Sequence, residues 1–158
     1  MSLRSHDDEP RRPVGRAIGF ARRIEDAFLT FVREHSLTLL RYALVTVFVW
    51  FGLLTTSGVN GIAGLIADVL WVLPSGSVDL LLGGWEIAIG LALLSRRTTR
   101  LAVVLAAAYV AVIMLPLVVS PEATFTQFPY GPSFEGVYIL KDWVLLGGVM
   151  TVGGLLEE

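Results

Sequence analysis

Four long runs of apolar residues limit what this chain can fold into. They cover residues 37–54, 78–94, 101–119 and 136–156. Each run has about the 17–25 residues that a helix needs to cross a hydrocarbon core of ~30 Å. A bilayer offers no water to the backbone, so a spanning segment satisfies its own polar groups as a helix. The sequence therefore predicts an all-α fold, an integral membrane four-helix bundle.

The composition agrees with a membrane protein. Hydrophobic residues make up 54% of the chain and charged residues 16%, against about 25% charged residues in soluble domains. The formal net charge of -2 argues against a nucleic-acid partner. Because the chain has no cysteine and both histidines, His6 and His35, lie outside the runs, iron–sulfur and bis-histidine haem ligation are excluded. We expect no intrinsic cofactor and no metal site.

Basic residues predict the orientation in the membrane. The link at 95–100 carries three arginines, whereas the other two connections have acidic residues, Asp68, Glu122 and Glu135, and neither lysine nor arginine. Cytoplasmic loops carry an excess of basic residues. We therefore expect both termini and the 95–100 link on the cytoplasmic side. Eight further arginines precede or enter the first run: Arg4, Arg11, Arg12, Arg16, Arg22, Arg23, Arg33 and Arg41.

Two apolar segments do not have the pattern of spans. Residues 14–35 place apolar side chains at three- and four-residue intervals, with arginines mostly on other faces. This pattern predicts an amphipathic interfacial helix, or alternatively a solvated helix docked on a partner. Residues 1–13 are expected to be a disordered tail, and residues 36–158 to form the membrane domain. The segment "GIAGLIADVLWVLP", between the first two spans, predicts a short outer-side helix with Trp71 at the membrane interface.

Apart from Asp79, the second residue of the second run, four charged residues fall inside the apolar runs. Arg41 lies near the cytoplasmic end of its run, where its side chain can snorkel to the headgroups. Glu86 lies roughly 10 Å below the outer end of the second run, from ~1.5 Å of rise per residue, and Lys141 is at a comparable depth in the fourth. Charges at membrane depth usually face the protein interior and pair. We expect Lys141 to pair with Glu86, with its neighbour Asp142, or with both.

This cluster has two interpretations. The charges could form a structural clamp that holds the second and fourth spans in register. They could instead line a polar cavity open to the outer side, since small-molecule sites combine apolar walls with a few convergent polar groups. Catalytic residues are not predicted. The residues expected to line the ligand site are Trp50, Trp85, Glu86, Tyr138, Lys141 and Asp142.

Parts of the chain resemble a known family. The stretch "LLRYALVTVFVWFGLL" is similar to the first helix of the DoxX-like superfamily, and within it the chain is most similar to the YkgB/RclC-type small inner-membrane proteins. The more specific stretch is "SPEATFTQFPYGPSFEGVYILKDWVLLGG". Its family-like elements are Pro121–Glu122, Phe128–Pro129–Tyr130 and Leu140–Lys141–Asp142, together with Glu86. The chain has Thr55 and Thr56 where family members are expected to have a lysine.

The resemblance implies a bacterial or archaeal plasma-membrane protein with a four-helix bundle. DoxX-like proteins are linked to quinone-dependent complexes and to oxidant resistance. It also implies that the outer-loop residues Pro121, Glu122, Phe128, Pro129 and Tyr130 belong to the functional region.

Three hypotheses for function follow. The first is a redox-associated subunit that binds a quinone-like headgroup, with hydrogen bonds from Lys141 to the carbonyl oxygens and proton transfer by Glu86 or Asp142. Its electrons would come from a membrane or cytoplasmic oxidoreductase partner. The second is a small-solute or proton carrier, which would be more plausible as a homo-oligomer. The third is a structural or assembly subunit.

Overall fold

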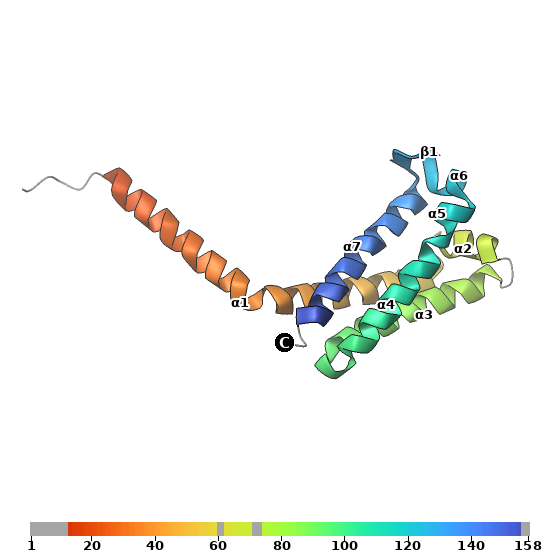
Figure 1. The fold of residues 1–158 in the computed structure, drawn as a ribbon, viewed down its shortest axis with the longest axis horizontal. Helices are drawn as coiled ribbons and strands as arrows, with labels where there is room; N and C mark the ends of the chain where they lie inside the picture. The colour runs from red at the N-terminus through yellow and green to blue at the C-terminus, as the bar shows by residue number, and fades with distance from the viewer. Residues whose placement is uncertain (1–12, 60–61, 71–73, 156–158) are drawn as a thin grey trace, which may run out of the picture. The chain divides into compact units, whose positions relative to one another are not determined.

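The computed structural model describes residues 13–59, 62–70 and 74–155. The chain divides into two units, Met1–Ser36 and Leu37–Glu158. Four helical segments in the described part are long and apolar enough to cross a membrane: Arg22–Thr56, Gly76–Leu94, Arg96–Val119 and Phe134–Leu155. The prediction of four helical segments with the length and hydropathy of membrane spans is therefore confirmed, and Figure 1 shows the helices that contain them.

The first helix, α1, covers Pro13–Thr56 and so includes both the predicted interfacial segment and the first predicted span. Residues 20–51 contain neither proline nor glycine, so nothing in the sequence ends a helix between the two segments. In unit 1 the side chains of Phe20, Ile24, Phe28 and Phe31 are exposed. An apolar surface that the structure leaves uncovered is compatible with the predicted interfacial helix. The predicted disordered tail lies outside the described residues, except for Pro13.

Four helices of unit 2 form a closed ring of contacts. After α1 come α3 (Ser75–Leu94), α4 (Thr99–Ile113) and α7 (Phe134–Leu155). Helix α4 packs on both α3 and α7. Glycines bring α1 against its two neighbours, α3 at Gly52 and Gly83, and α7 at Gly148, which lies against Leu44. The order α1–α3–α4–α7 and back to α1 is that of a four-helix bundle.

The third predicted span is interrupted. Helix α4 ends at Ile113, and a short helix, α5 (Leu115–Val119), follows after Met114. Pro116 explains the break, because it has no N–H to donate and its ring clashes with the carbonyl four residues earlier. The structure therefore differs from the single uninterrupted helix that we predicted for 101–119.

The connection between α1 and α3 contains α2 (Ile62–Leu70). This helix packs on α3 and α5 and buries Ile66 and Ala67 there. It lies in the segment of the chain for which the short helix was predicted. Trp71, the expected interfacial residue, lies outside the described residues.

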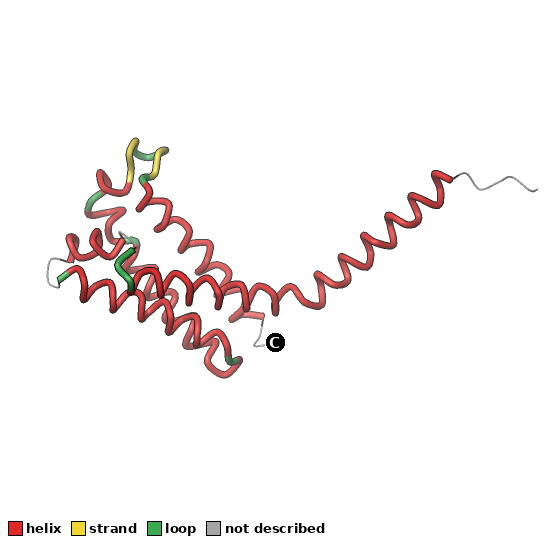
Figure 2. The backbone as a smooth tube through the Cα atoms, turned by 180° about the vertical axis from the view of Figure 1, so that it is seen from behind, coloured by secondary structure: helices red, strands yellow, loops and turns green. Residues whose placement is uncertain are grey.

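One short pair of strands accompanies the helices. After α5 and α6 (Pro121–Thr124), the strands β1 (Phe125–Gln127) and β2 (Gly131–Pro132) pair antiparallel. Phe128, Pro129 and Tyr130 form the turn between the two strands, and Pro129 with the following Gly131 favours a chain reversal here. This hairpin leads directly into α7, and Figure 2 shows it in yellow at one end of the bundle.

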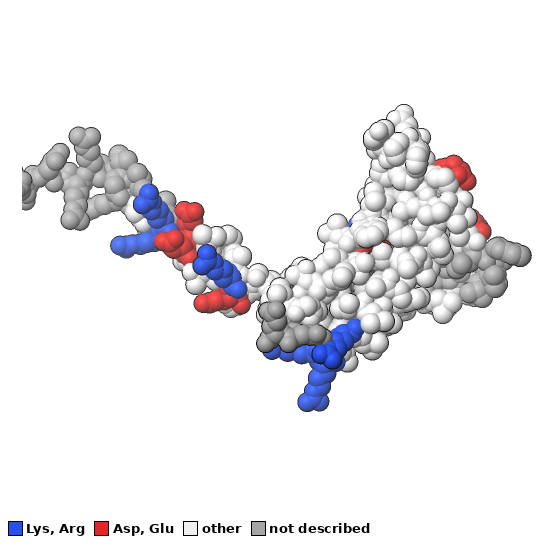
Figure 3. All heavy atoms as spheres, viewed as in Figure 1, with Lys and Arg blue, Asp and Glu red and all other residues white. Residues whose placement is uncertain are grey.

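The two ends of the bundle differ in charge. The link between α3 and α4 is a 3-10 turn, η1 (Arg96–Thr98), and we call this the basic end because Arg96, Arg97 and Arg100 lie there. We call the opposite end, which carries α2, α6 and the strands, the hairpin end. Figure 3 shows basic side chains of unit 2 gathered at the basic end and acidic side chains at the hairpin end. This asymmetry is the feature on which the predicted orientation depends.

Candidate functional site: a buried polar cluster

Each of the four bundle helices contributes a polar side chain to one region of the interior. These are Thr55 from α1, Glu86 from α3, Tyr109 from α4, and Lys141 with Asp142 from α7, which we call the polar cluster. As whole residues, Thr55, Glu86 and Asp142 are each 2% exposed. Buried ionisable groups are rare in membrane proteins and mark functional sites by default.

Glu86 is held by a hydroxyl from another helix. Thr55 Oγ1 donates a hydrogen bond to Glu86 Oε2 at 2.9 Å, and the same hydroxyl lies 3.0 Å from the Phe51 carbonyl of its own helix. Tyr109 also interacts with the Glu86 carboxylate as a side-chain hydrogen-bond partner. These contacts join α1, α3 and α4 around one carboxylate. Such hydrogen bonding partly replaces the water that the carboxylate has lost.

Lys141 pairs with its own neighbour. Its Nζ lies 2.8 Å from Asp142 Oδ1 and also stands over the Phe51 ring, 4.2 Å from the centroid, and the Tyr138 ring, at 5.2 Å. The lysine side chain is 26% exposed and that of Asp142 is 3% exposed. Of the alternatives left open by the sequence, the structure selects Asp142 for the direct ion pair. The long lysine stem lets the ammonium bend back although adjacent helical residues point in different directions.

Glu86 nevertheless interacts electrostatically with the Lys141–Asp142 pair. Both Lys141 and Asp142 interact with its charge, and Tyr109 interacts with both carboxylates. Two carboxylates and one ammonium give the cluster a formal charge of −1 when all three groups are ionised. One bound proton would make the cluster neutral, so this group of side chains has the composition for holding and releasing a proton.

The predicted aromatic residues lie in different surroundings. Trp85 donates from Nε1 to the Leu105 carbonyl at 3.1 Å and packs edge-on against Tyr109. Tyr138 packs against Phe51 and so lies beside Lys141. Trp50, however, is 64% exposed. Its ring therefore faces outward from the bundle, and it does not occupy the interior wall where we expected it.

Three members of the site were missed in the sequence. Thr55 and Tyr109 supply the partners of Glu86, and Phe51 supplies the aromatic face below Lys141. Tyr109 carried a usable signal, because it is the sole polar side chain between residues 101 and 119. Thr55 carried a weaker one, since a threonine near a helix end more often bonds to its own backbone.

The predicted outer-loop residues form a separate group at the hairpin end. Pro121 and Glu122 begin α6, and Phe128, Pro129 and Tyr130 form the turn between β1 and β2. Tyr130 is 92% exposed. A surface cavity of about 310 Å³ lies here, lined by Pro121, Glu122, Phe125 and Phe128.

Arg41, near the start of the first apolar run, contacts a second helix of the bundle. Its Nε donates a hydrogen bond to the Leu93 carbonyl of α3. Between Arg41 and the polar cluster the interior is filled by apolar side chains with at most 4% exposure: Leu44, Phe48, Ile89, Leu93, Val149 and Val152.

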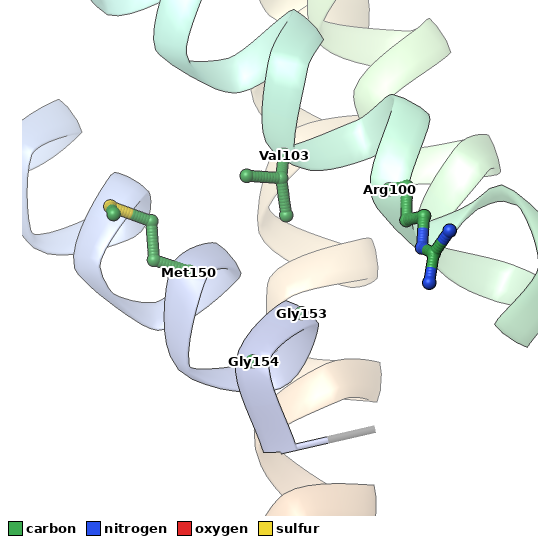
Figure 4. Close-up of a pocket in the computed structure, with 5 residues that line it drawn as sticks. All are labelled: Arg100, Val103, Met150, Gly153 and Gly154. Atoms are coloured by element: carbon green, nitrogen blue, oxygen red, sulfur yellow. The ribbon is translucent and has the colours of Figure 1, made fainter. Parts of the chain in front are cut away.

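Another cavity, at the basic end, has a mainly apolar lining. It measures about 300 Å³ and lies between α4 and α7, where Val103 points toward the C-terminal turns of α7 (Figure 4). Its lining residues are Arg100, Val103, Met150, Gly153 and Gly154. Among the described residues, no group of three or more His, Cys, Asp or Glu side chains is placed to hold a metal ion.

Comparisons of the chain with protein-family models, curated proteins and solved structures gave no match. The DoxX-like resemblance therefore stays a prediction, and the case for function depends on the polar cluster.

Proposed function

We propose that this protein binds the headgroup of a quinone-like small molecule in the membrane, at Lys141. The observation that carries the proposal is the contrast within the polar cluster. Glu86 and Asp142 are closed off from the surface, whereas the Lys141 side chain is partly exposed and its ammonium lies against two aromatic rings. A flat apolar ligand could stack near such rings while a carbonyl oxygen accepts a hydrogen bond from the ammonium.

The two carboxylates suit this ligand. A quinone takes up protons when it is reduced, so its site needs groups that can supply and accept them. Asp142 bonds directly to Lys141, and Glu86 is coupled to both. In this proposal the ammonium orients the headgroup and a carboxylate exchanges the proton. Electrons come from a partner oxidoreductase, because the chain has no cysteine and both its histidines, His6 and His35, lie outside the four apolar runs.

The proposal places the protein in a bacterial or archaeal plasma membrane, as a DoxX-like redox-associated subunit. Its termini and basic end face the cytoplasm, in keeping with the arginines of η1 and the acidic hairpin end. The polar cluster then lies nearer the outer side. The amphipathic part of α1 lies on the cytoplasmic membrane surface in this arrangement, with Ile24, Phe28 and Phe31 in the lipid.

A structural role is the second candidate, and one observation favours it. The bond between Thr55 and Glu86 joins α1 to α3 inside the bundle at 2.9 Å. Buried polar contacts of this kind hold membrane helices together. The carrier hypothesis has less support, because apolar side chains such as Phe48 and Ile89 fill the interior between the polar cluster and Arg41.

The test substitutes both members of the Lys141–Asp142 ion pair together. Lys141→Met alone would leave Asp142 buried without its partner, so the informative variant combines Lys141→Met with Asp142→Asn. We expect this pair to retain the fold and to bind a short-chain ubiquinone analogue at least about tenfold more weakly. Binding is measured by quenching of tryptophan fluorescence in detergent or nanodiscs.

Arg97→Gln serves as the control, because it removes one cation at an exposed position of the basic end. Weakened binding in the double variant alone supports the proposed site. Equal binding by all three proteins, or no binding by the wild type, would leave the structural role as the better explanation.

A further inference from the structure

A small cavity at the basic end brings two arginines together. It measures about 180 Å³ and lies between the unit 2 part of α1 and η1. Leu37, Thr38, Arg41 and Tyr42 line it from α1, and Arg96 lines it from η1. Its two cations come from segments far apart in the sequence, and neither acidic side chains nor other charged groups are among its lining residues.

Arg41, one of the two arginines that line the cavity, has a side-chain donor without a partner among the described residues. Arg41 uses Nε to bind the Leu93 carbonyl, but its Nη2 is buried and has no hydrogen-bond partner in the described part of the chain. Buried polar groups are nearly always hydrogen-bonded, and an orphaned one often marks a missing ion or water. A charged donor beside a second cation calls for an anionic acceptor in particular.

The volume of the cavity limits the size of the ligand. Pockets for drug-sized ligands usually have ~300–1,000 Å³, so this cavity suits a single small group and not a whole cofactor. Arginine forks match the oxygen atoms of phosphate, and two further lining residues, Thr38 and Tyr42, have hydroxyl groups that can donate hydrogen bonds. Basic pockets between membrane helices are known sites for phosphate-bearing lipid headgroups.

We propose that this cavity binds an anionic phosphate group through Arg41 and Arg96. Either the headgroup of an anionic lipid or free phosphate would supply this chemistry, and the site lies where α3 ends, beside residues 37–42 of α1. The site is separate from the polar cluster, because the buried apolar layer that includes Leu44, Phe48 and Leu93 lies between them. It does not depend on the quinone proposal.

The experiment compares the wild-type protein with Arg96→Gln, Arg41→Lys and Arg97→Gln. Arg96 is exposed, so its variant is expected to fold. Arg41→Lys keeps the charge but loses the planar fork. Arg97 neighbours Arg96 but does not line the cavity, and its variant removes the same charge. Circular dichroism checks that each variant keeps its helices.

Native mass spectrometry with added phosphatidylglycerol or phosphatidylcholine tests the lipid source, and a thermal shift with inorganic phosphate tests the free ion. We expect wild type and Arg97→Gln to retain phosphatidylglycerol over phosphatidylcholine, and Arg96→Gln and Arg41→Lys to retain it about tenfold more weakly. A phosphate-induced shift that is lost in the same two variants, without lipid selectivity, supports the site with free phosphate as its ligand. Indistinguishable behaviour of Arg96→Gln and Arg97→Gln in both arms would overturn the proposal.

Discussion

Thr55 has a single hydroxyl proton, and two acceptors compete for it. One is the Phe51 carbonyl, which most threonines in this position would bond, and the other is the Glu86 carboxylate. The carboxylate is the stronger acceptor because it carries charge and has lost its water. This residue therefore acts between helices, although its sequence context is typical of a bond within one helix.

Replacing Thr55 by valine should destabilise the bundle. The change preserves shape and removes the donor, so a buried carboxylate oxygen loses its partner, at a cost of about 1–3 kcal/mol. The thermal unfolding midpoint in detergent measures the effect. Thr46→Val is the matched control, because Thr46 is exposed and bonds to the Tyr42 carbonyl of its own helix. Equal midpoints for the two variants would show that the contact with Glu86 contributes nothing.

Replacing Lys141 and replacing Asp142 should destabilise the protein to different extents. Asp142 is 3% exposed and Lys141 is 26% exposed, so the aspartate has less access to water when it is left alone. Breaking a buried pair costs about 3–5 kcal/mol, because the remaining charge is uncompensated. We expect Lys141→Met to lower the unfolding midpoint more than Asp142→Asn does, and the double variant to recover most of the loss.

A double-mutant cycle on unfolding midpoints checks this order. Additive effects of the two substitutions would contradict a coupled pair.

The members of the site and their pairing differ in how far the sequence predicts them. Composition identified the charged residues of the site, because charges in apolar runs are few. The choice between Glu86 and Asp142 as partner of Lys141 depended on the bend of one flexible side chain, which no spacing rule specifies.

At the scale of the helices, glycines determine how α1 meets α3. A Cβ added at Gly52 would lie 2.7 Å from the Gly83 carbonyl oxygen, and one added at Gly83 would lie 2.6 Å from the Gly52 carbonyl oxygen. The two backbones are therefore in direct contact, as is common where small residues pack between membrane helices. This approach brings Thr55 and Glu86 within hydrogen-bonding distance.

Gly83→Ala should separate α1 from α3 and destabilise the bundle, since forcing a methyl group into a packed interface costs about 1–3 kcal/mol. Gly84→Ala is a control one residue away, because its added Cβ would meet nothing within 4 Å. Alanine is a better helix former than glycine, so that variant should unfold at the same or a higher temperature. Unfolding followed by circular dichroism distinguishes them, and equal losses in both would contradict close packing at Gly83.

The helices themselves were largely predictable. Apolar run length located α3 and α7 to within a few residues, because twenty consecutive apolar residues have few alternatives in a bilayer. The sequence also contains the cause of the break before α5, which is Pro116, but the length of the apolar run does not reveal it. The strands β1 and β2 were missed because two and three residues are too short for any periodic pattern.

On the scale of the whole molecule, polar features are sorted by height in the bundle. The basic end carries the arginines of η1 and the cavity at Arg41, an apolar layer follows, and the polar cluster lies beyond it. The hairpin end carries acidic side chains. Two separate polar regions at different heights are the arrangement expected of a protein that meets a different environment on each side of the membrane.

Membrane topology is the whole-molecule prediction, and the absence of cysteine makes it easy to test. A cysteine introduced singly by Tyr130→Cys lies in the 92% exposed turn of the hairpin end, and one introduced by Arg97→Cys lies at the basic end. Because basic loops stay in the cytoplasm, a membrane-impermeant maleimide should label the first variant in intact spheroplasts and the second only after lysis. The wild-type chain gives the background, since it has no thiol to label. Labelling of Arg97→Cys before lysis would show that the topology is the reverse of the predicted one. The polar cluster would then lie nearer the cytoplasm, where an electron-donating partner could approach Lys141 from the soluble side.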